Sequence, residues 1–255
     1  MSKKSAYITG ASSGIGEAFA FSLADNYNLV LIARNELKLQ QIAKELRNKT
    51  EVEIILADLS TPEGIGKITS LLESDPELDL FVNNAAYGSM GNFVDREIEE
   101  EVNQLQLNVM AVVRLSHAVL KNYHSRKHTG NLINVASMVG FFPTPTSVIY
   151  GASKAFVKNF SESLHEENKP FGITVQVLCP GFTRTEFQDR AGFQKENLPD
   201  FVWMDSKAVV EESLNSLKKQ EAVCIPGVLN RSTATIVDMI PGEILRILSG
   251  FVVKK

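Results

Sequence analysis

A tyrosine and a lysine stand four residues apart in the stretch VIYGASKAF, as Tyr150 and Lys154. Residues with this spacing share one face of a helix, so the lysine ammonium can stabilise the phenolate of the tyrosine. A free phenol has a pKa of about 10, and proton exchange at neutral pH needs such a cation in a site shielded from water. The same spacing recurs in NYHSRKH, as Tyr123 and Lys127, so spacing alone identifies no active site.

The surroundings distinguish the two pairs. Tyr150 comes 13 residues after Ser137, which closes the apolar run NLINVAS, whereas Met110 has the same offset from Tyr123. A serine at that place can hydrogen-bond a substrate oxygen and hold it facing the phenol. Tyr123 instead lies in a polar, histidine-rich stretch, which predicts a solvated helix end. Tyr150 and Lys154 are therefore the candidate catalytic pair.

Short runs rich in valine, isoleucine and leucine must form the elements that position this pair. Near-continuous hydrophobicity is typical of strands buried on both faces, hence of a parallel sheet with helices on both sides. Between the runs lie amphipathic stretches, such as residues 35–49, where Leu37, Ile42 and Leu46 have helical spacing. With no repeat and no linker, the sequence predicts one doubly wound α/β domain over residues 1–255, with about seven parallel strands. The runs are AYITG, NLVLIAR, VEIILAD, LDLFVNNA, NLINVAS, ITVQVLCP and AVCIPG.

A glycine-rich turn follows the first run, in TGASSGIGEAF. Glycines allow a tight turn and a close approach of backbone N–H groups to an anion, and the helix start adds partial positive charge. A plain strand-to-helix turn with a serine N-cap is the alternative, but the position after the first strand favours a cofactor pyrophosphate. The expected contacts are Gly10, Ser12, Ser13, Gly14, Ile15 and Gly16.

Several motifs, in this order, resemble the short-chain dehydrogenase/reductase family. They are the spacing Gly-x-x-x-Gly-x-Gly, NNAA at residues 83–86 and YGASK at residues 150–154, and the resemblance spans about residues 5–225. It implies a Rossmann fold, an NAD(P)-dependent oxidoreductase acting on CH–OH and C=O groups, and a homodimer or homotetramer. It also implies that Lys154 binds the nicotinamide ribose and that Asn108 holds a water in a proton relay. The implied catalytic set is Asn108, Ser137, Tyr150 and Lys154.

The second apolar run ends without a carboxylate, which bears on the choice of cofactor. Where NAD-binding proteins place an acidic residue this chain has Ala33, and Arg34 follows. A planar guanidinium suits a phosphate, so the expected cofactor is NADP (NADPH). Ala86 replaces the usual glycine of the family motif. The resemblance adds cofactor contacts at Asp58, Leu59, Asn84, Tyr150, Lys154, Pro180, Gly181, Thr183 and Thr185.

Two segments remain outside these motifs. An irregular stretch at about residues 187–205 carries Phe187, Phe193, Phe201 and Trp203, which line an apolar substrate pocket or pack in the core or an oligomer interface. The C-terminal tail, at about residues 231–255, is amphipathic and is expected to pack on the protein itself or on a partner subunit rather than on a membrane. Its apolar positions include Ile244, Leu245, Ile247 and Leu248.

Composition excludes other classes of function. A formal net charge of -4 without a dense basic cluster predicts no nucleic-acid binding. Cys179 and Cys224 lie in apolar runs and are expected to be core residues, so no metal site is predicted. The first strand begins almost at Met1, and no apolar run approaches the roughly 20 residues of a membrane span, so a cytoplasmic protein is expected.

The sequence thus predicts an NADP(H)-dependent carbonyl reductase or alcohol dehydrogenase with Tyr150 as acid and base. Its substrate is expected to be a small-molecule carbonyl or alcohol of apolar character, such as a 3-oxoacyl or steroid-like compound or another ketone. A serine hydrolase is disfavoured because INVASMVG lacks a serine between glycines. A catalytically silent NADP-binding sensor or interaction protein is the alternative from another class. That alternative predicts the loss of a catalytic residue, and all four are present.

Overall fold

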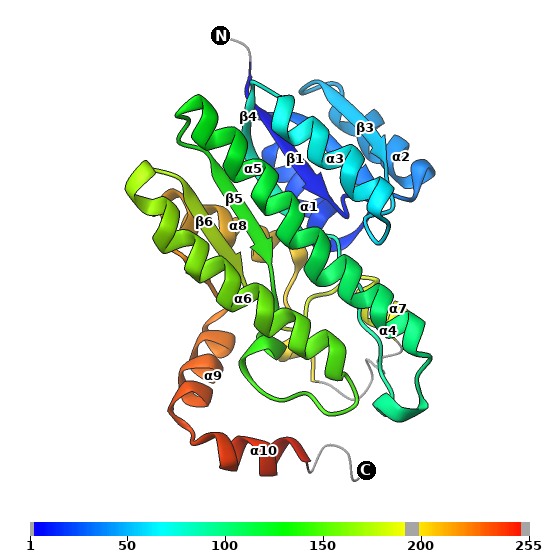
Figure 1. Ribbon diagram of the computed structural model, residues 1–255, viewed down its shortest axis with the longest axis vertical. Coiled ribbons are helices and arrows are strands. Elements are labelled where there is room, and N and C mark those ends of the chain that lie inside the picture. The colour runs from blue at the N-terminus through cyan, green and yellow to red at the C-terminus, as the bar shows by residue number, and fades with distance from the viewer. Residues whose placement is uncertain (1–2, 192–198, 251–255) are drawn as a thin grey trace.

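A parallel sheet with the strand order β3-β2-β1-β4-β5-β6-β7 forms the centre of the computed structural model, which describes residues 3–191 and 199–250 (Figure 1). Each pairing between neighbouring strands is parallel. The predicted α/β fold and each of the seven predicted strands are confirmed. The strands are β1 (Ser5–Thr9), β2 (Asn28–Ala33), β3 (Val52–Leu56), β4 (Leu78–Asn83), β5 (Asn131–Val135), β6 (Thr174–Leu178) and β7 (Val223–Cys224).

Helices cover both faces of the sheet. Apolar side chains of α1, α2 and α8 pack on one face, and those of α3, α5 and α6 pack on the other. The α-helices are α1 (Gly14–Leu23), α2 (Glu36–Leu46), α3 (Pro62–Ser74), α4 (Ile98–Leu105), α5 (Val112–Arg126), α6 (Val148–Asn168), α7 (Phe187–Arg190), α8 (Ser206–Lys218), α9 (Val228–Met239) and α10 (Gly242–Gly250). The other helical turns are η1 (Phe93–Asp95), η2 (Gln106–Ala111), η3 (Met138–Phe141), η4 (Lys169–Phe171) and η6 (Asp200–Val202).

Helix α2 shows how the apolar spacing works and where it misleads. Leu39, Ile42 and Leu46 are buried against the sheet, whereas Leu37, predicted to share their face, is 79% exposed. Leu37 and Leu39 are two residues apart, which places them about 200° apart around the helix axis. The helix was predicted correctly, but one position of its buried face was not.

The order of the strands creates the place where a site can form. β1 and β4 are neighbours, although the chain runs from β1 away to β2 and β3 before it returns to β4. In an open α/β sheet, such a switch point opens a crevice at the carboxyl ends of the strands. Because the strands are parallel, the segments that follow β1 to β6 lie at that edge. The segment after β1 is the glycine turn. The segments after the next five strands carry Arg34, Asp58, Asn84, Ser137 and Pro180.

The segment between β6 and α8 is called the excursion here. Its two ends, at the base of the excursion, are hydrogen-bonded to each other. Thr183 and Met204 form an isolated β-bridge, Arg184 N donates to Met204 O over 2.9 Å, and Met204 N donates to Phe182 O over 2.9 Å. The segment was predicted to be irregular, but α7 and η6 are helical turns within it. Phe193, one of the aromatic residues expected to line a pocket, lies outside the described residues.

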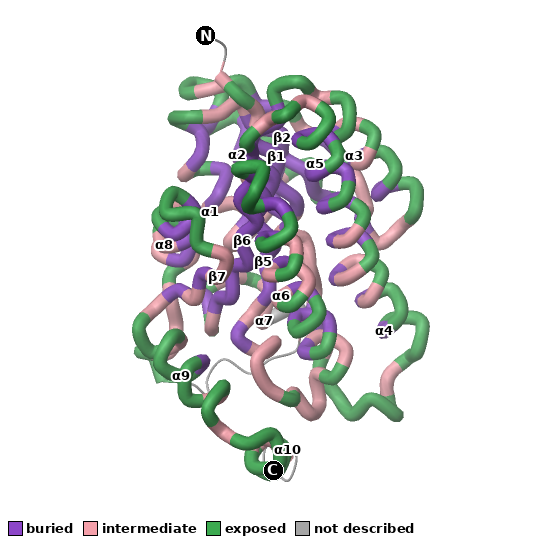
Figure 2. Tube along the Cα trace, turned by 60° about the vertical axis from the view of Figure 1, so that its left-hand side comes forward, coloured by how far each residue is buried: buried purple, intermediate pink, exposed green. Residues whose placement is uncertain are grey.

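The C-terminal helices α9 and α10 extend away from the sheet (Figure 1), and most of their surface is exposed (Figure 2). Ala234 anchors α9 and is buried, but none of the described residues of α10 is. Ile247 is 62% exposed and Leu248 is 53% exposed. Of the two kinds of packing expected for this tail, packing of α10 on its own chain is therefore wrong. No helix within residues 3–191 and 199–250 is long and apolar enough to cross a membrane.

Candidate active site

Tyr150 and Lys154 lie on the first turns of α6, beside the carboxyl end of β5. Lys154 is 3% exposed, and its Nζ donates a hydrogen bond to the carbonyl oxygen of Val135 over 2.7 Å. The same Nζ lies 5.7 Å from the centre of the Tyr150 ring. The predicted pair is therefore brought together, with the amine fixed to β5 and the ring half-buried beside it.

Burial controls the proton affinity of both side chains. Burial raises the pKa of Tyr150 to about 12, and a hydrogen bond with Ser137 opposes this rise. Burial also lowers the pKa of Lys154 to about 8, so this amine keeps its charge at neutral pH. The sequence led us to expect a phenol pKa below 10, but burial raises it instead, and only the hydrogen bond with Ser137 opposes this rise.

Ser137 stands between β5 and η3. Its Oγ accepts a hydrogen bond from Val139 N over 3.3 Å, which holds the start of η3. Ser137 also opposes the rise in the pKa of Tyr150, so this hydroxyl lies within reach of the phenol oxygen. Serine and tyrosine can thus contact one and the same oxygen of a substrate.

Asn108 is fully buried in η2, a π-helical turn between α4 and α5. Its Nδ2 donates to Tyr87 O over 2.9 Å and to Ser153 Oγ over 3.2 Å, and its Oδ1 accepts from Tyr87 N over 3.2 Å. Ser153 Oγ in turn donates to Tyr150 O over 2.7 Å. The amide therefore links the segment after β4 to the backbone of the candidate catalytic tyrosine. A π-turn within a helix often marks a functional site.

Tyr123 and Lys127 are not a second pair on one helical face. Lys127 follows α5 with φ 52, in the left-handed region, so the helix has ended before it. Tyr123 is 0% exposed, and its hydroxyl donates to Asn131 O over 3.0 Å. The predicted solvated helix end is wrong at this residue, because Tyr123 occupies the inward face of α5.

The turn between β1 and α1 is tight enough that glycine is required. Gly10 has φ 65, and a Cβ there would lie 2.8 Å from Asn84 Nδ2. A Cβ at Gly16 would overlap the carbonyl oxygen of Gly10. Asn84 braces this turn, because its Nδ2 donates to Thr9 O over 2.9 Å. Ser13 precedes α1 without capping it through its side chain, so the free N–H groups at this described helix start fit an anion such as a pyrophosphate.

Arg34 and Asp58, which follow β2 and β3, approach each other. Arg34 Nη1 lies 3.4 Å from Asp58 Oδ2, and 72% of the arginine side chain is exposed. Burial would raise the pKa of Asp58, but hydrogen bonds from Ser60 and the charge of Arg34 lower it overall. A cavity of about 460 Å³ lies here and is lined by Arg34, Ser60, Thr61, Tyr87, Asn103 and Leu107. Leu59, predicted as a cofactor contact, has a side chain that is buried in the core.

The residues predicted after β6 lie against the glycine turn. The side chain of Thr185 contacts Gly14 so closely that a Cβ on that glycine would lie 2.9 Å from Thr185 Cγ2. Thr183 is 3% exposed, and its hydroxyl donates to Gly181 O over 3.1 Å. The segment that begins at Pro180 therefore joins the cofactor turn to the excursion before α8.

Gly88 was not predicted from the sequence, although it touches the candidate catalytic tyrosine. A Cβ on Gly88 would lie 3.1 Å from Phe187 Cζ and 3.3 Å from Tyr150 Cδ2. The rings of Phe187 and Tyr150 are 5.3 Å apart between centres, at an angle of 42°. Phe187 was predicted to line a substrate pocket or to pack in the core or an oligomer interface, and it lies directly on the tyrosine. The only sequence signal for Gly88 is a glycine shortly after NNAA.

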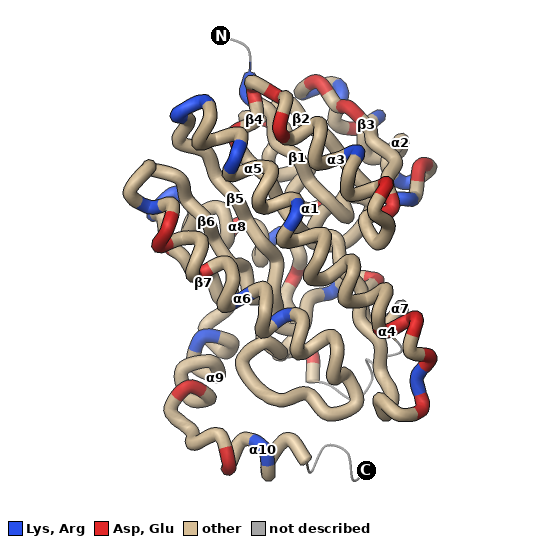
Figure 3. The backbone as a smooth tube through the Cα atoms, in the orientation of Figure 1, with Lys and Arg blue, Asp and Glu red and all other residues tan. Residues whose placement is uncertain are grey.

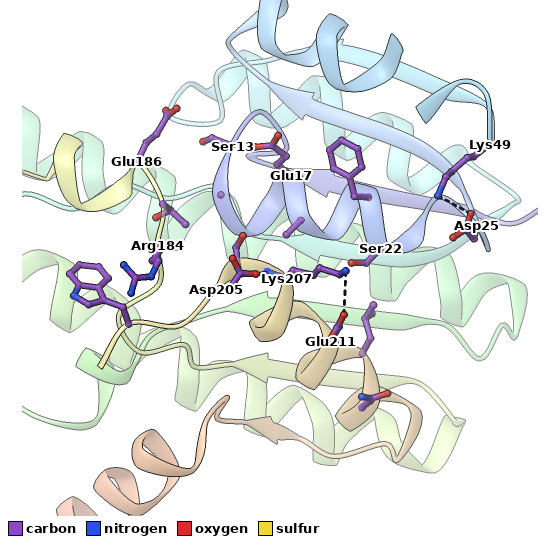
Figure 4. A pocket seen from close by; sticks show the side chains of 18 of the residues that line it. Ser13, Glu17, Ser22, Asp25, Lys49, Arg184, Glu186, Asp205, Lys207 and Glu211 are labelled. Carbon is purple, nitrogen blue, oxygen red and sulfur yellow. Dashed lines mark hydrogen bonds and ion pairs between the residues drawn. The ribbon is translucent and has the colours of Figure 1, made fainter. Parts of the chain in front are cut away.

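A cavity of about 1520 Å³ contains none of the four candidate catalytic residues. It lies on the outer face of α1 and α8 beside residues 184–186 (Figure 4). Charged side chains line it, among them Glu17, Lys207 and Glu211. We place the active site at Tyr150 instead, because a phenol, a buried lysine and a serine hydroxyl converge there.

The chain is similar to several known proteins. The family model described as short chain dehydrogenase matches residues 4–196. The 17-beta-hydroxysteroid dehydrogenase type 3 of Mus musculus is 38% identical over 182 residues, which are 69% of this chain and 58% of that protein. The very-long-chain 3-oxoacyl-CoA reductase of Anas platyrhynchos is 32% identical over 231 residues, which are 87% of this chain and 72% of that protein. A short-chain dehydrogenase from Sphingobium yanoikuyae, solved in complex with NADPH, is 34% identical, covers 93% of this chain and 96% of its own, and has a TM-score of 0.84.

Proposed function

We propose that this chain, which belongs to the short-chain dehydrogenase/reductase family, is an NADP(H)-dependent reductase of an apolar ketone or of the corresponding alcohol. The chain is an oxidoreductase that acts on CH–OH and C=O groups and uses a nicotinamide cofactor. The observation that carries the proposal is the buried Lys154 amine beside Tyr150, with Ser137 on the phenol oxygen. The family resemblance implies the same residues, and these contacts support that assignment.

The proposed mechanism assigns one role to each side chain. When bound, NADPH supplies the hydride that is added to the carbonyl carbon, and it is oxidised to NADP⁺. The Tyr150 phenol donates its proton to the carbonyl oxygen, so that C=O is reduced to CH–OH. Ser137 orients that oxygen, and the charge of Lys154 stabilises the phenolate that remains. In the oxidation direction, the Tyr150 phenolate accepts the proton of the alcohol.

The cofactor assignment rests on the end of β2. Ala33 leaves no carboxylate to hold the ribose hydroxyls of NAD, and Arg34 presents an exposed guanidinium beside a cavity. The neighbouring glycine turn has the close approach and the free helix start that a pyrophosphate needs. Titrating NADPH and NADH into the wild type and Arg34→Ala tests this. We expect Arg34→Ala to weaken NADPH about tenfold or more, with little effect on NADH; equal affinities in the wild type would contradict the assignment.

The substrate class follows from what covers Tyr150. The Phe187 ring and Gly88, which has no side chain, form an apolar wall beside the Tyr150 ring. The two relatives compared above are named for a very-long-chain 3-oxoacyl-CoA substrate and for a hydroxysteroid. We therefore propose a ketone attached to a long acyl chain or a fused-ring body. NADPH oxidation followed at 340 nm with a panel of such ketones and of small polar carbonyls tests this choice; binding of NADPH without oxidation of any of them would favour a sensor instead.

Two tyrosine variants test the catalytic assignment. Tyr150→Phe should lower kcat by a factor of about a hundred or more and leave the Kd for NADPH nearly unchanged, because only the transferable proton is lost. Tyr123→Phe is the matched control. It removes a buried hydrogen bond to Asn131 O and should cost about 1 kcal/mol of stability, but kcat should stay the same. Equal losses of kcat in the two variants would refute the role of Tyr150.

We further propose a single domain, a cytoplasmic location and a homo-oligomer. The seven strands form one sheet, which supports a single domain. Cys179 and Cys224 are buried free thiols, as suits a reducing compartment. Acidic and basic residues are interspersed along the chain (Figure 3), which suits a small-molecule substrate better than a polyanion. The exposed apolar side chains of α9 and α10 support a homodimer or homotetramer.

A further inference from the structure

An ion pair joins the cofactor side of the site to the substrate side. Lys38 Nζ lies 2.5 Å from Glu186 Oε1, across a separation of 148 residues in the chain. Lys38 belongs to the first turn of α2, the helix that follows Arg34. Glu186 comes between Thr185, which touches Gly14, and Phe187, which touches Tyr150. The pair therefore links the end of β2 to the segment that carries the aromatic wall.

A second carboxylate faces the same lysine. Glu17 lies in the first turn of α1, directly after the glycine turn. Burial raises the pKa of Glu17, the charge of Lys38 lowers it, and the charge of Glu186 raises it. Figure 4 shows Ser13, Glu17 and Glu186 at one end of the large cavity. Lys38 is thus paired with Glu186 and also acts on the charge of Glu17, beside the glycine turn.

Arg34 and Lys38 are two cations only four residues apart, in the short segment from the end of β2 to the first turn of α2. Asn35 caps α2, and its Oδ1 accepts a hydrogen bond from Lys38 N over 3.1 Å, which fixes the first turn. Each cation is held by a carboxylate of another segment: Arg34 by Asp58 and Lys38 by Glu186. The side chains of Asp58 and Glu186 are 39% and 51% exposed, so both can return to water at little cost.

We propose that Lys38 is a second residue that recognises the 2′-phosphate of NADP(H), and that this phosphate replaces Glu186 as its partner. A phosphate carries more charge than a carboxylate and is the stronger partner for an ammonium. NAD(H) has no such group, so the pair with Glu186 persists when it binds. Because Glu186 is next to Phe187, the choice of cofactor is thereby coupled to the segment that packs on Tyr150. This inference rests on the proposed preference for NADP(H).

Affinities of single variants test the first half of the proposal. Lys38→Met should weaken NADPH about tenfold, with little change for NADH, because only the 2′-phosphate contact is lost. Glu186→Gln should tighten NADPH severalfold, because the competing carboxylate is gone. Lys44→Met is the matched control: Lys44 lies exposed in the last turn of the same helix, and its loss should change neither affinity. Fluorescence titration of purified protein gives the four Kd values for each cofactor.

Two results separate this inference from the proposed function. If the wild type prefers NADPH and Arg34→Ala loses that preference, but Lys38→Met does not weaken NADPH selectively, the role of Lys38 is refuted and the cofactor assignment stands. If the wild type binds NADPH and NADH equally, the cofactor assignment itself fails, and the role of Lys38 fails with it.

The coupling has its own readout in Trp203, the single tryptophan of the chain. Its ring packs against Phe182 at an angle of 54°, with 5.4 Å between ring centres, at the base of the excursion that contains Glu186. NADP⁺ should change the tryptophan emission of the wild type more than NAD⁺ does, and this difference should disappear in Lys38→Met. Equal changes with both cofactors would overturn the coupling, whatever the affinities are.

Discussion

At the level of single side chains, the proposed active site keeps a charge where folding alone would avoid one. Burial lowers the pKa of Lys154 from its ordinary 10.5 to about 8, which means that the fold pays to hold the ammonium at neutral pH. Val135 O accepts one hydrogen bond from it and offsets part of this cost. A residue with only a structural role would be better replaced by a neutral one.

Removal of this charge should therefore stabilise the protein in a pH-dependent way. Below pH 8 the amine is protonated in both the folded and the unfolded chain, so the full cost of burial is present. Between pH 8 and 10.5 the folded amine is neutral while the unfolded one still holds its proton, and stability rises with pH. We expect the free energy of unfolding of Lys154→Met to exceed that of the wild type by roughly 3 kcal/mol at pH 7 and by about half as much at pH 9.5.

Denaturant unfolding at the two pH values measures this difference. Lys44→Met, which removes an exposed lysine of α2, should show no difference from the wild type at either pH. A stability gain in Lys154→Met that is the same at pH 7 and pH 9.5 would contradict the lowered pKa.

Some of these residues could be predicted from the sequence and others could not. Tyr150 comes 13 residues after Ser137 and four before Lys154, and this spacing suggested a shared site. The fold brings the three side chains together. Gly88 has no such signal, because its constraint comes from Phe187 and Tyr150, which are remote in sequence. The burial of Tyr123 was missed for a related reason: its neighbours are polar, but its own direction from α5 is inward.

Among the secondary-structure elements, α4 has the clearest supporting role for the site. It holds the segment after β4 by side chains that reach back to it. Gln104 Nε2 donates to Tyr87 O over 3.0 Å, and the buried Glu101 accepts from Ser89 Oγ over 3.0 Å. Glu101 also accepts from Arg96 Nε over 3.0 Å. These contacts flank Gly88, so α4 sets the distance between that backbone and the tyrosine ring.

Loss of the Glu101 charge should loosen the segment that holds Gly88 against the Tyr150 ring. Glu101→Gln keeps the volume of the side chain but weakens the bonds to Ser89 and Arg96, at a cost of about 1–3 kcal/mol. We expect a lower melting temperature and a KM for the ketone that rises severalfold, while the Kd for NADPH stays near that of the wild type. Glu99→Gln, an exposed position of the same helix, is the control. A lower melting temperature without any change in KM would show that α4 supports the fold and not the site.

Apolar runs predicted the strands well because strands of a parallel sheet are buried on both faces and need no alternation. The same reasoning could not find the π-turn η2 or the short helix α7. A π-turn depends on one extra residue in a helix that otherwise has ordinary apolar spacing. Helix α7 is only one turn long, and its conformation depends on the contacts of Thr185 and Phe187.

At the level of the whole molecule, the arm formed by α9 and α10 is the feature that the single chain does not explain. Helix α10 has nine residues, and a helix of this length is marginal in water without a packing partner. Its apolar residues face outward, and Met239, at the end of α9, is 79% exposed. A partner subunit would cover this surface and supply the packing that the chain itself does not.

Charges placed on the arm should therefore dissociate the assembly. Light scattering after size-exclusion chromatography should give a dimer or a tetramer for the wild type. Ile247→Glu with Leu248→Glu should weaken association more than tenfold, because it removes buried apolar area and adds charges that the interface cannot solvate. Arg246→Gln, on the same helix, should leave the mass unchanged. A monomeric wild type, or an unchanged mass in the double variant, would show that the arm does not hold the subunits together.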